Sequence, residues 1–270
     1  MKVIGLCKAF SGHEFLEASI DSIYKNLEAI YFVISDTSWA GEKLTENHKV
    51  LETVLKYQKN KDIDKKIHII STSSTNQDEQ YKIGHKKIIE DYPDIEWLCL
   101  FDTDEVWEEV VFENAVKRLD FLDEYNSVCC QMYTYIKSPL YRVDPLENCK
   151  PFVFVRALFF GYTAGIRGSK ACPTYYMEDI FFHHFTYVRE TEEDVFKKIK
   201  TSLIGDKDCE VICDPVDIDK WKKDKWDHLP YSKDFHTTKG YETSWHKIEQ
   251  ININQLPKSV RGLEIVKEAI

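Results

Sequence analysis

Several patterns that would assign this chain to a common class at once are missing from its 270 residues. None of its eight cysteines forms a C-x-x-C pair, so a zinc site is disfavoured and buried, reduced thiols are expected. The absence of G-x-G-x-x-G and of G-x-x-x-x-G-K-[ST] argues against dinucleotide-binding and P-loop folds. Basic residues are not in excess, and the net charge of −10 disfavours an extended nucleic-acid interface.

Long apolar runs are also missing. The longest apolar segment, residues 151–166, is interrupted by Arg156, and the first ten residues do not have the pattern of a signal peptide. We therefore expect no transmembrane segment and a cytoplasmic location. The chain does contain 43% hydrophobic and 13% aromatic residues, a composition typical of a globular protein with a sizeable core.

Hydrophobic periodicity predicts strands that alternate with helices in the first part of the chain. Continuous apolar runs predict strands at 2–7, 29–36, 65–72 and 96–104. Helical patterns lie between them, at 11–27, 46–60 and 78–92, and Ser11 is the predicted N-cap of the first helix. This alternation indicates an α/β fold with a mostly parallel sheet that helices flank on both faces.

The pattern changes after residue 105. Helices are predicted at 111–125 and 191–204, and strands at 127–137, 152–160 and 179–188. The segment 214–236 is polar and aromatic, and it is predicted to be irregular or short-helical. The second part of the chain is therefore expected to extend the α/β unit and to end in an added C-terminal portion.

The segment WLCLFDTDEVW, residues 97–107, brings a predicted strand to a stop on Asp102, Asp104 and Glu105. Carboxylates this close raise one another's pKa unless a cation neutralises them. Alternate residues of a strand project to one side, so Asp102 and Asp104 are predicted to bind one Mg²⁺ or Mn²⁺. An acidic turn that only solvates the strand end is the alternative. Asp36 ends another parallel strand and is expected at the same sheet edge, where such sheets bind ligands.

A second candidate segment, DIFFHHFTYVR, covers residues 179–189. On a strand, His183 and His184 point to opposite faces, so at most one of them serves a site at this edge. Tyr187 and Arg189 follow directly and are candidates to meet a diphosphate.

Together these segments resemble glycosyltransferases of the GT-A (Rossmann-like) fold, family-2-like. The resemblance rests on VIGLCKAFSGHEFLEASIDSIY, on the strand that ends at Asp36, on LCLFDTDEVW and on HHFTYVR. It covers residues 1–107 well and continues in patches to about residue 200. It implies one GT-A domain with a nucleotide-sugar-binding half at 1–107 and an acceptor and catalytic half at 108–200, followed by a C-terminal extension at 201–270.

The resemblance implies a nucleotide-diphosphate sugar donor and a divalent cation, Mn²⁺ or Mg²⁺. Asp102, Asp104 and His184 are the implied cation ligands, and Asp102 also contacts the donor. Further donor contacts are implied for one set of residues: Ala9, Phe10, Asp36, Lys82, Lys86, Tyr187 and Arg189. Lys82 or Lys86 would replace a positive charge, because the family's R-N motif is absent. The familiar D-D-G-S is here DTSWAG, so the base stays open, with uridine favoured over guanosine.

The implied reaction transfers the sugar to a hydroxyl of a glycan or glycolipid with inversion. Glu178 and Asp179 are the expected general-base pair, and Asp144, Glu147 and Asp194 are alternatives. At least one of Trp221 and Trp226 is predicted to line the acceptor cleft, although these side chains could instead anchor the C-terminal portion. Two other functions remain open: a nucleotidyltransferase on a similar sheet, and an inactive module that binds nucleotide sugars.

Overall fold

The computed structural model describes most of the chain. The described residues are 1–37, 46–146, 149–160, 173–204, 219, 222–227, 231–233 and 245–269.

The first half of the chain forms a parallel sheet. Its strands are β1 (Val3–Ala9), β2 (Ala29–Ser35), β3 (Ile67–Thr72) and β4 (Trp97–Leu100). They lie in the order β3-β2-β1-β4, and each neighbouring pair is parallel. Every residue of β1, β2 and β4 is buried, which explains why these strands are continuous apolar runs rather than alternating ones.

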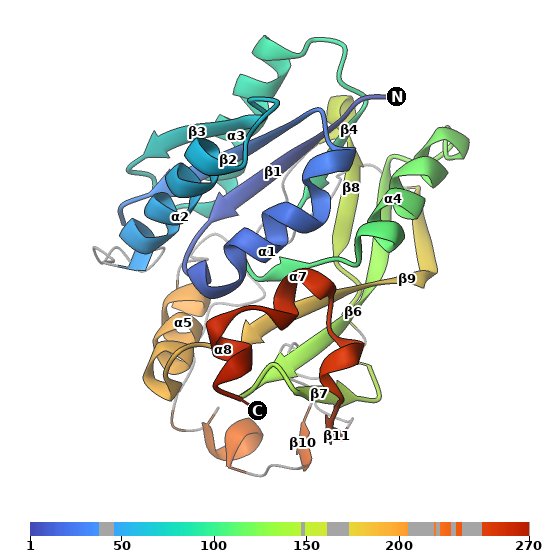
Figure 1. Ribbon diagram of the computed structural model, residues 1–270. Helices are drawn as coiled ribbons and strands as arrows, with labels where there is room; N and C mark the ends of the chain where they lie inside the picture. The colour runs from blue at the N-terminus through green and yellow to red at the C-terminus, as the bar shows by residue number, and fades with distance from the viewer. Residues whose placement is uncertain are drawn as a thin grey trace.

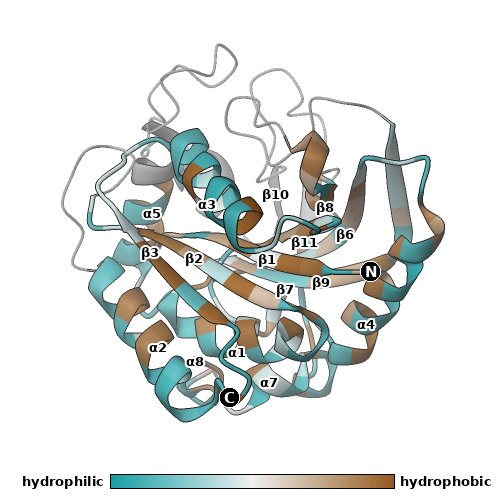
Figure 2. Cartoon of the chain, turned by 90° about the horizontal axis from the view of Figure 1, so that it is seen from above, coloured by the Kyte–Doolittle hydropathy of each residue, from teal (hydrophilic) through white to brown (hydrophobic). Residues whose placement is uncertain are grey.

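Helices cover both faces of this sheet (Figure 2). They are α1 (His13–Ile23), α2 (Glu46–Asn60), α3 (Gln77–Asp91) and α4 (Glu109–Arg118). Figure 2 shows α3 on one face and α1, α2 and α4 on the other. The buried residues of α1 include Phe15, Leu16 and Ile20, and those of α3 include Tyr81 and Ile88.

Strand alternation builds a separate core on each face. Cys7 of β1 packs in one cluster with Leu16 of α1 and Val54 of α2. Leu6, its neighbour on the strand, packs on the opposite face with Tyr81 of α3. The two-residue period of the central strand therefore holds both helical layers.

The second half of the chain extends the sheet mainly with antiparallel strands. Beyond β4 the order is β8 (Phe152–Arg156), β6 (Ser127–Ile136), β7 (Tyr141–Asp144), β11 (Trp245–Gln250) and β10 (Tyr231–Lys233). The long strand β9 (Thr174–Tyr187) runs parallel to β6, and the short β5 (Glu105–Val106) pairs with β9. Figure 1 shows this second half beside the parallel strands.

The remaining elements are helical. Helix α5 (Glu192–Ile204) follows β9, and α7 (Lys258–Arg261) and α8 (Glu264–Lys267) close the described chain. Single turns complete the set: η1 (Tyr24–Asn26), η2 (Leu119–Phe121), η3 (Ala157–Phe159), η4 (Lys222–Trp226) and η5 (Ile253–Gln255). The last helices return to α1, where Phe15 packs with Val260 and Val266 (Figure 1).

The predicted α/β class, with a parallel central sheet that helices flank, is confirmed. The predicted N-cap is wrong: Gly12, with φ of 73°, caps α1, and Ser11 also has a positive φ of 50°. The Ser11 carbonyl accepts from Thr103 Oγ1 at 2.6 Å, and its N–H donates to Asn47 Oδ1 at 3.1 Å. These tertiary bonds bend the connection, and a Cβ on Gly12 would lie 2.5 Å from Thr103 Oγ1.

Two observations bear on the earlier expectations. Cys7, Cys99, Cys129 and Cys130 are buried, as predicted, whereas Cys149 is exposed. The other cysteines lie outside the described residues. Among the helices of the described ranges, none is long and apolar enough to cross a membrane.

Candidate active site

The acidic residues after β4 form a loop, residues 102–105, that is held from two directions. Thr103 bonds to the connection between β1 and α1, as described above. On the other side, the Phe185 N–H donates to the Asp104 carbonyl at 2.9 Å, and Glu105 pairs with His184 across β5 and β9. This carboxylate loop is therefore fixed between the parallel sheet and β9.

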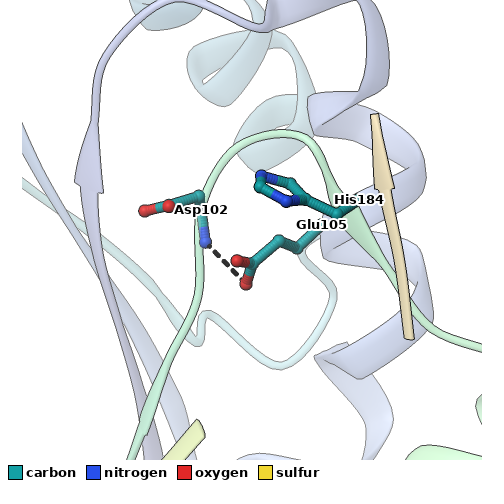
Figure 3. Close-up of side chains that lie close together, drawn as sticks. All are labelled: Asp102, Glu105 and His184. Carbon is teal, nitrogen blue, oxygen red and sulfur yellow. Dashed lines mark hydrogen bonds between the residues drawn. The ribbon is translucent and has the colours of Figure 1, made fainter. Parts of the chain in front are cut away.

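Asp102, Glu105 and His184 form what we call the acid–histidine group. Each offers one ligand atom, and these atoms all lie within 4.8 Å of one another. Figure 3 shows the Glu105 carboxylate beside the His184 ring, with the Asp102 N–H donating to Glu105 Oε2 at 3.1 Å. Glu105 is 1% exposed, whereas the Asp102 side chain is 27% exposed. Two carboxylates and an imidazole are a donor set that fits a divalent cation such as Mn²⁺.

Asp104 belongs to a different group, the Asp104 cluster, with Arg189, Lys198 and Thr186. Asp104 Oδ2 lies 2.6 Å from Arg189 Nη2 and 2.6 Å from Lys198 Nζ, and Lys198 Nζ lies 2.8 Å from Thr186 Oγ1. Burial alone would raise the pKa of Asp104, but the charges of Lys198, Arg189 and His184 hold that pKa well below its usual range. Its carboxylate is therefore ionised and already bonded to two cations.

The acid–histidine group contains Asp102 but not Asp104, the two aspartates that were predicted to share one cation, although Asp104 Oδ1 lies 3.6 Å from His184 Nε2. The physical reason is that β4 ends at Leu100, so residues 102–104 lie in a turn and do not alternate as they would on a strand. Glu105, which begins β5, is the second carboxylate of the acid–histidine group, beside Asp102.

Lys8 is a further cation at this edge. It is 8% exposed on β1, and its Nζ lies 3.4 Å from Asp102 Oδ1 and 5.6 Å from the centre of the Tyr81 ring. Asp102 follows β4, the strand next to β1. Lys8 therefore adds positive charge at the sheet edge where a ligand would bind.

The two histidines point to opposite faces, as predicted. His184 Nε2 lies 3.6 Å from Asp104 Oδ1, whereas His183 Nδ1 lies 2.8 Å from the Tyr135 hydroxyl. Burial, together with the charge of Arg142, lowers the pKa of His183 to about 3. His183 is therefore a neutral core residue.

The predicted residues Tyr187, Arg189 and Trp226 lie in the interior. The Arg189 guanidinium donates to the carbonyls of Phe185 and Val188 as well as to Asp104, and its side chain is 2% exposed. Tyr187 and Trp226 are buried in one small core that includes residues of α5. At 3% exposure, Trp226 packs against Phe196, which favours the anchoring role. Trp221 lies outside the described residues.

The predicted base-binding residues gather at the ends of β1 and β2. Ala9 and Phe10 are buried, and Asp36 is exposed, with Oδ1 accepting from Thr37 Oγ1 at 2.9 Å. Asn47, which the sequence did not single out, ties the two strand ends together. Its side chain accepts from the Ser11 N–H and donates to the Ser35 carbonyl at 2.6 Å.

The remaining predicted residues have exposed side chains. Lys82 and Lys86 are on α3, where Lys86 is exposed and lies 4.0 Å from Glu90. Glu178 and Asp179 are exposed and ion-paired with Lys150 and Arg118.

Glu178 and Asp179 fall in an irregularity of β9, where the pairing with β6 jumps from Met177 to Phe181. At about 3.3 Å per residue, Glu178 is roughly 20 Å along the strand from His184. The structure does not bring this pair to the acid–histidine group. Among the alternative bases, Asp194 accepts from Thr191 Oγ1, Asp144 ends β7, and Glu147 is outside the described residues.

No family model matches the chain, and no curated protein matches it. Solved structures give distant matches. TarS from S. aureus is 11% identical, with 78% of this chain and 66% of that chain covered and a TM-score of 0.44. Mannose-6-phosphate isomerase from Helicobacter pylori is 15% identical, with 57% and 60% covered and a TM-score of 0.37. Mannose-1-phosphate geranyltransferase from Thermus thermophilus is 12% identical, with 58% and 50% covered and a TM-score of 0.34.

The chain spans less than two thirds of each of these three structures. Likenesses this distant assign no function, so the functional argument rests on the side chains of the site.

Proposed function

We propose that this chain is a divalent-cation-dependent glycosyltransferase that moves a sugar from a nucleoside-diphosphate donor to a hydroxyl acceptor. The observation that carries the proposal is the convergence of Asp102, Glu105 and His184 after β4, beside three cationic side chains. Open α/β sheets bind ligands at the carboxyl ends of their strands, and this group lies at that edge. The resemblance to family-2-like enzymes supports the same activity.

Asp102, Glu105 and His184 would hold the cation, which supplies positive charge to the diphosphate that departs. Ala9, Phe10 and Asp36 would meet the nucleotide base. A carboxylate at Asp36 can accept from the imide N–H of uracil or from the N1–H and amino group of guanine, so uridine donors come first and guanosine donors second.

In the transfer, the bond between the anomeric carbon and the β-phosphate oxygen breaks, and the acceptor oxygen bonds to that carbon from the opposite side. The acceptor proton passes to a carboxylate, and the nucleoside diphosphate leaves. Glu178 and Asp179, the pair expected from the resemblance, are ion-paired with Lys150 and Arg118 and lie roughly 20 Å along β9 from His184, so they are not the base in this arrangement. The acceptor would be a glycan or glycolipid.

The connection between β1 and α1 disfavours a nucleotidyltransferase. Such enzymes usually have a glycine-rich basic loop there that cradles a triphosphate. Here only Phe10, Ser11 and Gly12 join the two elements, and Thr103 packs directly on them.

The test is product analysis with a panel of nucleotide sugars, with and without Mn²⁺. A glycosyltransferase releases nucleoside diphosphate, whereas a nucleotidyltransferase releases pyrophosphate from a nucleoside triphosphate and a sugar phosphate. We expect nucleoside diphosphate, released only with the cation and lost in Glu105→Gln. Full activity of EDTA-treated protein, or release of pyrophosphate alone, would refute the proposal.

A further inference from the structure

Lys198 is placed at the site by α5, the helix that follows β9. It lies in the second turn of α5, and its Nζ reaches Asp104 Oδ2 at 2.6 Å and Thr186 Oγ1 at 2.8 Å. The ammonium of Lys198 therefore comes from a separate helix and contacts the carboxylate loop. Two other residues of that loop, Asp102 and Glu105, belong to the acid–histidine group.

Lys198 and Arg189 share the same carboxylate oxygen, but they differ in how they are held. Arg189 is 2% exposed and also bonds to two backbone carbonyls, so it is fixed in the interior. The Lys198 side chain is 16% exposed, and its ammonium is carried on a flexible stem. Of the two cations, Lys198 is the one that can turn to a ligand while Arg189 keeps Asp104 in place.

The charges at this edge suggest which kind of ligand that is. Three carboxylates, Asp102, Asp104 and Glu105, face three cations, Lys8, Arg189 and Lys198, so their charges cancel. A divalent cation on the acid–histidine group would leave two positive charges uncompensated in a poorly hydrated site. The diphosphate of a nucleotide sugar carries two negative charges and would restore neutrality.

We propose that Lys198 is a substrate-binding residue that contacts the diphosphate of the donor, with Asp104 as its resting partner. This inference rests on the proposed function and adds a residue to it. When the donor binds, the ammonium of Lys198 turns from Asp104 to a phosphate oxygen, and Arg189 alone then neutralises Asp104. The contact stays in place as negative charge builds on the departing diphosphate.

The pKa of Lys198 is consistent with this role. Burial and the charge of Arg189 lower it to about 8, although Asp104 acts in the opposite direction. An additional anion would favour the charged form of the amine.

The experiment measures binding of inorganic pyrophosphate, which needs no nucleotide base, to the Mn²⁺-loaded full chain by calorimetry. Lys198→Met keeps the apolar stem without the charge, and Lys198→Arg keeps the charge. Lys197→Met is the matched control, because Lys197 is the adjacent, exposed lysine on α5. Lys198→Gln is a second neutral variant for the case in which Lys198→Met does not fold.

We expect the neutral variants at 198 to weaken pyrophosphate binding about tenfold or more, the loss of one charge-assisted hydrogen bond. Lys198→Arg should stay within about threefold of the wild type, and Lys197→Met should not change. Unchanged binding in the neutral variants, or an equal loss in Lys198→Arg, would overturn the proposal.

Uridine diphosphate and uridine, titrated in parallel, separate this inference from the proposed function. A loss for uridine diphosphate but not for uridine supports a phosphate contact, whereas an equal loss for both indicates a structural role and overturns it. If the wild type binds pyrophosphate through Lys198 but releases no nucleoside diphosphate from any sugar donor, glycosyl transfer is refuted and the anion contact stands.

Discussion

Asp102 and Asp104 are separated by one residue, yet they face regions of the protein that differ in kind. Asp102 is partly exposed and lies with Glu105 and His184, where carboxylates outnumber the cation of Lys8. Asp104 is buried, and two cations share one of its oxygens. The first region has excess negative charge for a cation, and the second has excess positive charge for an anion.

This difference shows how one short loop can provide binding regions for both a divalent cation and a diphosphate. A cation and a diphosphate bind side by side if opposite excess charges are fixed next to each other before they arrive. Thr103, between the two aspartates, holds the loop to Ser11 through its hydroxyl.

The largest expected effect is on stability. Asp104→Asn removes the negative charge of the carboxylate whose Oδ2 contacts both Arg189 and Lys198. A buried cation without its partner lowers the stability of the folded state. We expect a loss of about 3 kcal/mol in the free energy of unfolding. Asp102→Asn, at a partly exposed site, should cost roughly 1 kcal/mol or less. Urea unfolding of both variants without metal measures the difference.

Equal losses in the two variants would show that the regions do not differ as described. Loss of activity in Asp104→Ala would follow from lower stability as well as from a lost cation ligand, so activity alone does not test Asp104 as a ligand.

The next largest effect is on cation affinity. Glu105→Gln and His184→Ala each remove a ligand, and we expect Mn²⁺ affinity to fall about a hundredfold or more, since even outer partners of metal ligands cost tenfold or more. His183→Ala is the matched control, because His183 contacts Tyr135 on the opposite face. It should lower stability and leave Mn²⁺ affinity nearly unchanged.

Calorimetric titration with Mn²⁺ measures these affinities. A His183 variant that loses as much affinity as the His184 variant would contradict the assignment of the two faces.

Much of the fold around these two regions could be predicted from the sequence. Buried parallel strands are continuous apolar runs, so β1 to β4 and the helices between them were visible as a pattern. The opposite directions of His183 and His184 followed from the two-residue period of a strand.

The division of the acidic residues could not be predicted in the same way. It depends on β4 ending at Leu100 and on Glu105 pairing with His184, and such long-range pairing leaves no local pattern. Lys198 was equally hidden, because a lysine on an amphipathic helix has the same pattern whether it meets solvent or a buried carboxylate.

The smallest expected effect concerns Asp36, an acidic residue at the same edge that belongs to neither region. It is exposed at the end of β2, and Asn47 holds that strand end to the connection after β1. Asp36→Asn should weaken uridine diphosphate binding about tenfold, the value of one hydrogen bond to a charged acceptor. Stability and Mn²⁺ affinity should not change, because the side chain bonds locally, to Thr37. Titration of the variant with uridine, guanosine and adenosine diphosphates checks this directly. Adenine has an acceptor nitrogen where uracil and guanine have a ring N–H, so tight binding of adenosine diphosphate by the wild type would rule out Asp36 as the residue that selects the base.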